Sequence, residues 1–127
     1  MKTKLSDQDL ATRVIVSGIH FDLTPALRQA AITKIVAVLR HEKNLVRARI
    51  DLELERGRRG EDQFIAKGHL EIKGPDVVAQ VESEDAYKSI DLLVDKLSEL
   101  LRRRHQEAVD TRNNIRRHAS ADSDRGE

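Results

Sequence analysis

The stretch at residues 83–104 is SEDAYKSIDLLVDKLSELLRRR, and its pattern predicts a long amphipathic helix. Ser83 is a suitable N-cap, and the two carboxylates after it suit the positive end of the helix dipole. Three arginines end the stretch, so we expect one face to join a core and the far end to meet an anion. The apolar positions that recur at helical spacing are Ala86, Tyr87, Ile90, Leu93, Val94, Leu97, Leu100 and Leu101.

Four other segments predict β-strands. Residues 13–19 (RVIVSGI) are rich in β-branched side chains, and residues 45–55, 64–73 and 77–81 alternate apolar with polar positions. Alternation of this kind is typical of strands with one buried face and one wet face. In the second strand, the predicted buried positions are Val46, Ala48, Ile50, Leu52 and Leu54.

A further helix is predicted between the first two strands. Thr24 caps its start, and Pro25 takes the first helical position, where its missing N–H has no cost. The helix should end near Arg40. Its apolar stripe consists of Leu27, Ala31, Ile35, Val38 and Leu39.

These elements follow the order β-α-β-β-β-α, which predicts an α+β fold: a two-layer sandwich with a four-stranded mixed sheet and both helices on one face. The first strand–helix–strand unit should be parallel and right-handed, and the meander after it antiparallel. This topology is similar to that of double-stranded RNA-binding domains. We predict a flexible N-terminal extension at residues 1–12, one folded domain at residues 13–109 and a disordered basic tail at residues 110–127.

Composition narrows the function classes. The 127 residues are 35% charged, include only 2% aromatic residues and contain no cysteine. The sequence therefore excludes disulfides and thiolate chemistry, and it argues against a base-stacking platform. The five histidines lack the spacing of metal ligands, and no P-loop, dinucleotide or catalytic-triad motif is present. No segment has the apolar length of a signal peptide or a membrane span. We expect a soluble cytoplasmic protein that is not an enzyme and needs no cofactor or metal.

Three stretches form a recognisable pattern. Residues 14–28 are VIVSGIHFDLTPALR, residues 48–55 form an alternating strand, and residues 83–97 are SEDAYKSIDLLVDKL. Together they resemble the ribosome hibernation-promoting factor family, also called ribosome-associated inhibitor A and, under an older label, sigma-54 modulation protein. The last stretch is similar to the family's most specific motif, and the resemblance covers roughly residues 13–107.

The resemblance implies the same β-α-β-β-β-α fold and a role in ribosome hibernation under stress or in stationary phase. Family members bind the small ribosomal subunit in the channel for messenger and transfer RNA, and they inhibit translation by steric competition. The implied partners are 16S-type ribosomal RNA and neighbouring ribosomal proteins, with no membrane and no small-molecule substrate, and the implied state is a monomer. Long members carry a second, dimerising domain, which we do not expect here. Whether the tail promotes or opposes ribosome dimerisation stays open.

The candidate RNA-binding residues are basic. Between residues 102 and 118, six arginines stand against two carboxylates. Arginine forks pair well with phosphates, and each neutralised phosphate releases counterions; a solvated helix end that suits the dipole is the alternative. If the two helices lie side by side, their cations would form one basic strip, although scattered surface cations are the simpler explanation for each. The candidates are Arg28, Lys34, Lys88, Lys96, Arg102, Arg103, Arg104, Arg112, Arg116 and Arg117, with His105 beside them.

Two other basic features have ordinary explanations. Arg47 and Arg49 lie on the wet face of a strand whose carboxylates should pair across to Lys67 and Lys73. The loop at residues 57–60 (GRRG) matches the G-x-x-G clamp of KH domains but joins two strands, so we interpret it as a mobile hairpin loop with at most an extra phosphate contact. Two further function classes stay open: a protein-binding transcription (sigma factor) modulator and a generic double-stranded RNA-binding module.

Overall fold

The elements occur in the predicted order, with one short helix added at the start. The computed structural model describes residues 6–125 and, of their side chains, those of residues 6–110 and 113. The elements are α1 (Asp7–Thr12), β1 (Val14–Ile19), α2 (Pro25–Leu39), β2 (Leu45–Glu55), β3 (Gln63–Ile72), β4 (Val77–Ser83) and α3 (Ala86–Arg125).

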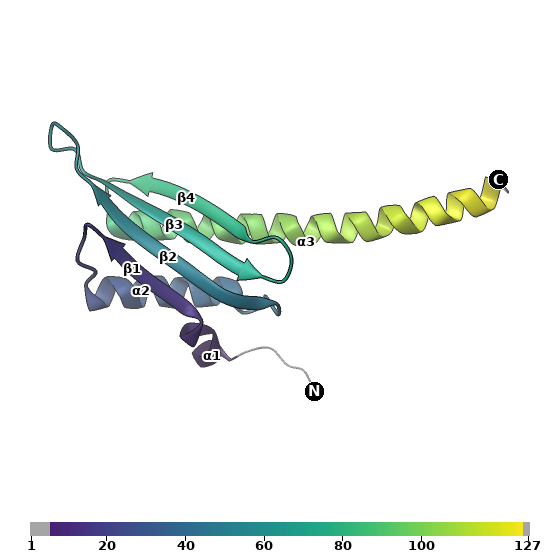
Figure 1. Ribbon diagram of the computed structural model, residues 1–127, viewed down its shortest axis with the longest axis horizontal. Helices are drawn as coiled ribbons and strands as arrows, with labels where there is room; N and C mark the ends of the chain where they lie inside the picture. Colours follow the sequence, from purple (N-terminus) through teal and green to yellow (C-terminus); the bar gives the residue numbers. More distant parts are fainter. Residues whose placement is uncertain (1–5, 126–127) are drawn as a thin grey trace.

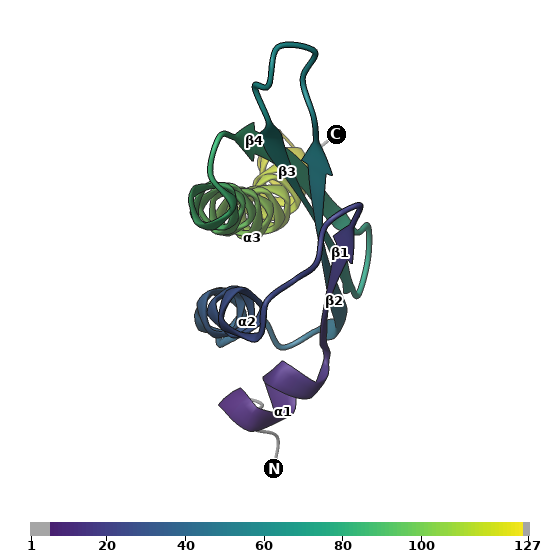
Figure 2. The same ribbon diagram turned by 90° about the vertical axis from the view of Figure 1, so that its left-hand side faces the viewer.

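The four strands form one sheet in the order β1-β2-β3-β4. β1 pairs with β2 in parallel, whereas β2 with β3 and β3 with β4 pair antiparallel. Helices α2 and α3 lie side by side on one face of this sheet, and the other face is open (Figures 1 and 2). The predicted α+β sandwich, including its parallel and antiparallel pairings, is confirmed.

Helix α2 begins as its sequence predicts. The Thr24 hydroxyl accepts a hydrogen bond from the Leu27 amide at 3.1 Å, and Pro25 follows in the first turn. The helix ends at Leu39, one residue before the predicted end. Its buried side chains are Leu27, Ala31, Ile35, Val36 and Leu39, and Val38 packs against them in part.

Helix α3 lies close to the middle of the sheet because β3 has a glycine there. A Cβ atom on Gly68 would lie 2.8 Å from Cδ1 of Leu97, so that leucine would have to shift, and 3.3 Å from Cδ1 of Leu93, which is a tight contact. Both leucines are fully buried. Gly68 therefore sets the distance between α3 and the sheet.

The start of α3 differs from the prediction. Asp85, rather than Ser83, caps the helix: its carboxylate accepts from the Lys88 amide at 3.1 Å. Ser83 ends β4 instead, and its hydroxyl lies 2.6 Å from the hydroxyl of the fully buried Ser89, which donates to the Phe64 carbonyl at 2.7 Å. These hydroxyls attach the first turns of α3 to the sheet without an unpaired polar group.

The N-terminal segment is more ordered than the sequence suggests. Residues 7–12, predicted as part of a flexible extension, form helix α1, in which the Ser6 hydroxyl accepts from the Asp9 amide at 3.1 Å. Leu10 is only 1% exposed and belongs to the core. A single buried leucine among polar residues is too short a pattern to indicate a helix by periodicity. The rest of the predicted extension, residues 1–5, lies outside the described part.

Two predicted core positions are wrong. Val46 is 57% exposed, because the pairing of β2 with β3 shifts between Leu45 and Arg47 and this irregularity turns Leu45 to the core instead. Tyr87 is 46% exposed because it lies at the edge of the apolar stripe of α3, beside the buried Ala86.

Helix α3 continues well past the sheet (Figure 1). Among the described side chains of this helix, the last buried one is Leu101, yet the helix extends to Arg125, where an irregular tail from residue 110 was expected. Residues 86–125 contain no glycine or proline and include many good helix formers, which favours continuation. Within residues 6–125, no helix is both long and apolar enough to cross a membrane.

Candidate nucleic-acid interface

The outer side of α3, away from α2, presents cations at helical spacing. Arg103 follows Lys96 by seven residues, close to two full turns, so these two lie on one side of the helix. Lys88 is eight residues before Lys96 and lies about 80° around the helix from it, and all three are exposed. Arg103 donates to the Glu99 carboxylate at 2.8 Å, a surface pair that polyanions can compete with. Arg102 is also exposed, but it follows Asp95 by seven residues and therefore projects on the side of that carboxylate. We call Lys88, Lys96, Arg102 and Arg103 the outer cations.

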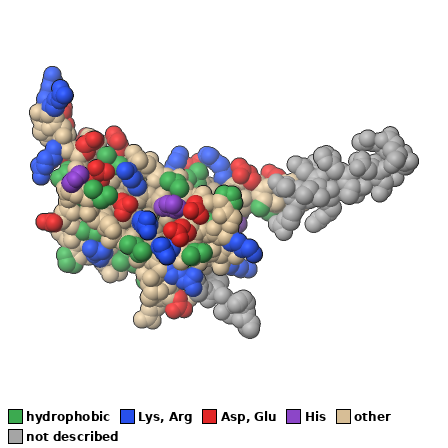
Figure 3. All heavy atoms as spheres, in the orientation of Figure 1, with side chains coloured by type: hydrophobic (Ala, Val, Ile, Leu, Met, Phe, Trp, Pro, Cys, Tyr) green, Lys and Arg blue, Asp and Glu red, His purple; other side chains and the backbone are tan. Residues whose placement is uncertain are grey.

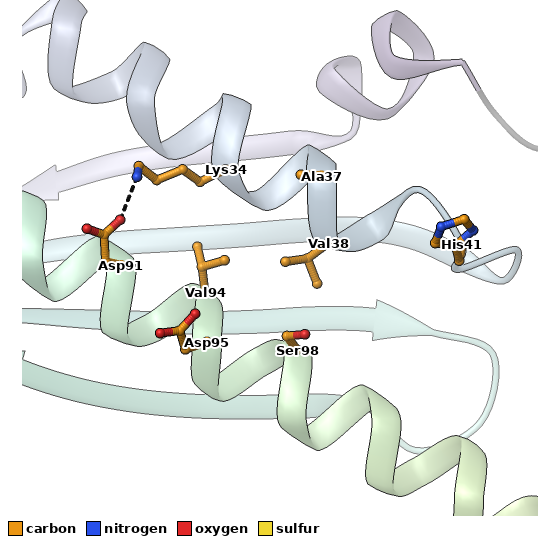
Figure 4. Close-up of a pocket in the computed structure, with 8 residues that line it drawn as sticks. All are labelled: Lys34, Ala37, Val38, His41, Asp91, Val94, Asp95 and Ser98. Atoms are coloured by element: carbon orange, nitrogen blue, oxygen red, sulfur yellow. Dashed lines mark ion pairs between the residues drawn. The ribbon is translucent and has the colours of Figure 1, made fainter.

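The side of α3 that faces α2 has a different character. Asp91 and Asp95, four residues apart, line a groove between the two helices together with Val38 and Val94 (Figure 4). Nζ of Lys34 on α2 lies 2.6 Å from Oδ1 of Asp91. The groove therefore contains two carboxylates against one lysine, and its cation is already paired.

The predicted basic strip across both helices is not continuous. Arg28 points to the edge of the sheet, where it donates to the Val16 carbonyl of β1 at 2.6 Å. Lys34 points the opposite way, to Asp91 of α3. Because Arg28 and Lys34 diverge and Asp95 lies in the groove between the helices, these cations do not form one surface with the outer cations.

Arg104 has a structural role. Its guanidinium donates to the Lys73 carbonyl at 2.7 Å and also to the Pro75 carbonyl, so it braces the turn between β3 and β4. Gly74 in this turn has φ +95°, and a Cβ there would lie 2.6 Å from Nη2 of Arg104. Of the three consecutive arginines, only Arg102 and Arg103 are thus fully presented to solvent.

His105 contacts the loop between α2 and β2. Its Nε2 lies 3.2 Å from Oε1 of Glu42, a residue that is only 7% exposed. The charge pattern of the sequence does not indicate the pairing of His105 with Glu42, and it does not indicate the burial of Ser89. The side chains of Arg112, Arg116 and Arg117 lie outside the described residues, so their predicted RNA contacts stay predictions.

The open face of the sheet carries charges of both signs (Figure 3). Lys67 lies 3.8 Å from Glu53, and Arg47 lies 3.7 Å from Glu71, which confirms cross-strand pairing on this face. His69 lies 2.7 Å from Asp76. Such a mixed face does not favour a polyanion. Among the described residues, no group of three or more His, Asp or Glu side chains is arranged to hold a metal ion.

An α+β sandwich with exposed cations along the outer side of one helix is a suitable architecture for contacting a nucleic-acid backbone. The chain belongs to the sigma 54 modulation protein / S30EA ribosomal protein family, whose model matches residues 14–108.

Named relatives cover most of this chain. A ribosome hibernation promoting factor from Pseudomonas putida is 33% identical over 95 residues, which span 75% of this chain and 87% of the relative. The factor of the same name from Azotobacter vinelandii is 31% identical over 98 residues, 77% of this chain and 87% of the relative.

Solved structures share the fold. A ribosomal subunit interface protein from Coxiella burnetii matches with a TM-score of 0.65 at 25% identity, covering 73% of this chain and 97% of that protein. The N-terminal domain of Protein Y from Thermus thermophilus matches with a TM-score of 0.58 at 26% identity, covering 69% of this chain and 92% of that domain.

Proposed function

We propose that this protein is a ribosome hibernation factor that binds the small ribosomal subunit in the channel for messenger and transfer RNA and inhibits translation under stress or in stationary phase. Family membership and the names of the relatives support the ribosomal role. The proposed binding domain is residues 13–109, acting as a monomer in the cytoplasm, the compartment of the ribosome. No catalytic step is required.

The observation that carries the proposal is the presentation of the outer cations. Lys88, Lys96, Arg102 and Arg103 are exposed along one helix that is itself packed rigidly against the sheet. Their contacts would be to phosphates and sugars, which position a protein on RNA without reading sequence. Inhibition then follows from occupancy: a folded domain in the channel excludes the RNAs that initiation needs.

Co-sedimentation with purified small subunits at several salt concentrations tests this proposal. We expect wild-type binding to weaken as salt rises and to compete with messenger and initiator transfer RNA. Replacing Arg102 and Arg103 together by Ala should lower affinity by about tenfold or more near 0.1 M salt and reduce the salt dependence.

A matched control removes two cations from the open sheet face. The double change of Arg47→Ala and Lys67→Ala alters the net charge equally but lies on the sheet face that carries both signs of charge, so affinity should stay close to wild type. Equal losses of affinity in both variants would show that net charge alone accounts for the effect. No binding by the wild-type protein would refute the proposal.

The family description also names sigma 54 modulation, so a protein-binding transcription modulator is the second candidate. Binding to a protein partner that changes little with salt, in the absence of subunit binding, would favour it. Binding of naked RNA duplexes as tightly as of subunits would instead indicate a generic double-stranded RNA-binding module.

A further inference from the structure

The loop between β2 and β3, residues 56–62, extends beyond the ends of β1 and β4 (Figure 1). The outermost part of this projection carries Lys or Arg side chains (Figure 3). The Gly60 amide donates to the Gly57 carbonyl at 3.2 Å, so residues 57–60 close a four-residue turn. Arg58 and Arg59 occupy its two central positions, and both are exposed.

Two glycines give this turn its narrow shape. A Cβ on Gly57 would lie 2.4 Å from the Glu61 carbonyl oxygen, so the two arms of the loop approach as closely as only glycine permits. Gly60 has φ +83°, a conformation that favours glycine over other residues. The GRRG pattern thus builds a tight tip with two adjacent arginines.

Charge is sorted along the loop. At its base, Arg56 lies 3.8 Å from Asp62, and the other carboxylates flank the tip on the strand side. Arg58 and Arg59 form no ion pair with any described side chain and contact no part of the core. Because nothing within the described fold uses these two guanidinium groups, their presentation suits an external anion.

We infer that the tip formed by Arg58 and Arg59 is a second phosphate-binding contact for ribosomal RNA. This inference rests on the proposed function. The tip lies beyond the end of the sheet where α3 begins (Figure 1), whereas Arg104, next to Arg103, contacts the β3–β4 turn at the opposite end. The ten residues of β3, which run between these ends, span about 33 Å.

Two phosphate contacts so far apart on one rigid body determine orientation as well as affinity. Contacts along α3 alone would allow the domain to rotate about the helix axis. A second contact at the hairpin tip removes that freedom, and once α3 is bound it forms at high effective concentration. Arginine is suited to this contact since its planar fork pairs with two phosphate oxygens.

A salt series of small-subunit binding tests the tip. Replacing Arg58 and Arg59 together by Ala should lower affinity by roughly tenfold or more near 0.1 M salt, and the slope of log affinity against log salt should become shallower by about 1.5. Replacing both by Lys retains the charge and should restore most of the affinity. Arg56→Ala removes a cation from the same loop that is paired at its base, and its effect should be much smaller.

A position-specific measurement separates this inference from the proposed function. Because the chain has no cysteine, a single introduced cysteine can carry an iron chelate that cleaves nearby RNA, and the unmodified wild type is the reagent control. Glu61→Cys keeps both tip arginines, and Gln106→Cys lies near Arg103. We expect cleavage of ribosomal RNA from both positions, at two separate regions.

The outcomes are distinct. Cleavage from position 106 but not from 61, with an unchanged salt slope for the tip variant, overturns the tip contact and leaves the proposed function intact. Cleavage of a ribosomal protein from position 61 in place of RNA cleavage also overturns it. Failure of the wild-type protein to bind small subunits refutes the proposed function and, with it, this inference.

Discussion

Helix α3 carries cations on one side and carboxylates on another, and it presents the two sets differently. On the outer side, Lys88 and Lys96 are exposed and extend into solvent. On the side toward α2, Asp91 and Asp95 take comparable positions, and Asp91 is paired with Lys34 at 2.6 Å. Whether α3 can bind a polyanion therefore depends on which of its sides faces α2. The total charge of α3 does not indicate this.

Two adjacent arginines also differ in whether they face solvent or contact another part of the protein. Arg103 is exposed and forms only a surface pair with Glu99, whereas Arg104 donates to two backbone carbonyls of the β3–β4 turn. A step of one residue rotates the side chain by about 100° around a helix. Consecutive arginines consequently have separate environments, and a cluster in sequence is divided in space.

The largest expected effect separates the buried and outer sides of α3. Leu97 is fully buried and Leu92 is 38% exposed. Leu97→Ala should lower the free energy of unfolding by about 2–5 kcal/mol because it opens a cavity under the helix. Leu92→Ala, the same chemical change on the outer side, should alter it by less than about 1 kcal/mol. Urea denaturation measures both, and similar losses would contradict the packing described.

An intermediate effect distinguishes the two neighbouring arginines. Arg104→Ala should lower the free energy of unfolding by about 1 kcal/mol, since two carbonyls lose a charged donor, with little change in subunit affinity. Arg103→Ala should have the reverse profile, weakening subunit binding and leaving stability nearly unchanged. Urea denaturation combined with the co-sedimentation assay measures both quantities. If Arg104→Ala weakened binding in a fully stable protein, its assignment as a brace would be wrong.

The smallest effect concerns α1. The hydrogen bond and charge of the Arg40 guanidinium lower the pKa of the Asp7 carboxyl below its ordinary value. The folded state therefore favours the ionised carboxylate, and this stabilisation is complete above the ordinary pKa of aspartate and is lost as the pH falls through the lower, folded value. Asp7→Asn should be slightly less stable than wild type at neutral pH, and the difference should vanish in acid. Thermal unfolding across the pH range measures it, and a pH-independent difference would contradict this pairing.

Local patterns predicted most of the architecture. The Thr24–Pro25 start of α2, the alternation in β3 and the apolar stripe of α3 each depend on neighbours within a few residues. Long-range pairing caused the exceptions. Val46 turned outward through an irregularity that involves two strands, and α1 is held by contacts of Leu10 and Asp7 with the rest of the fold.

The residue types of the candidate site could be predicted from the sequence, but the surface that they form could not. Sequence spacing places Lys96 and Arg103 on one side of a helix, and the structure shows that Lys88, Lys96 and Arg103 are exposed. It could not indicate that Arg28 would meet β1 or that Lys34 would meet Asp91, because those partners are separated from them by 12 and 57 positions in the chain. The role of Arg104 likewise depends on a turn distant in sequence.

The sequence by itself determined the elements from β1 to the first part of α3, their order and the family, because periodicity, capping and motif are local properties of the chain. Only the tertiary structure decided which cations are available to a partner: it committed Arg28, Lys34 and Arg104 to contacts within the protein and presented Lys88, Lys96, Arg102 and Arg103 to solvent. The physical reason is that a charged side chain is available only where no partner from another element lies within reach, and that is settled when helices and strands pack together.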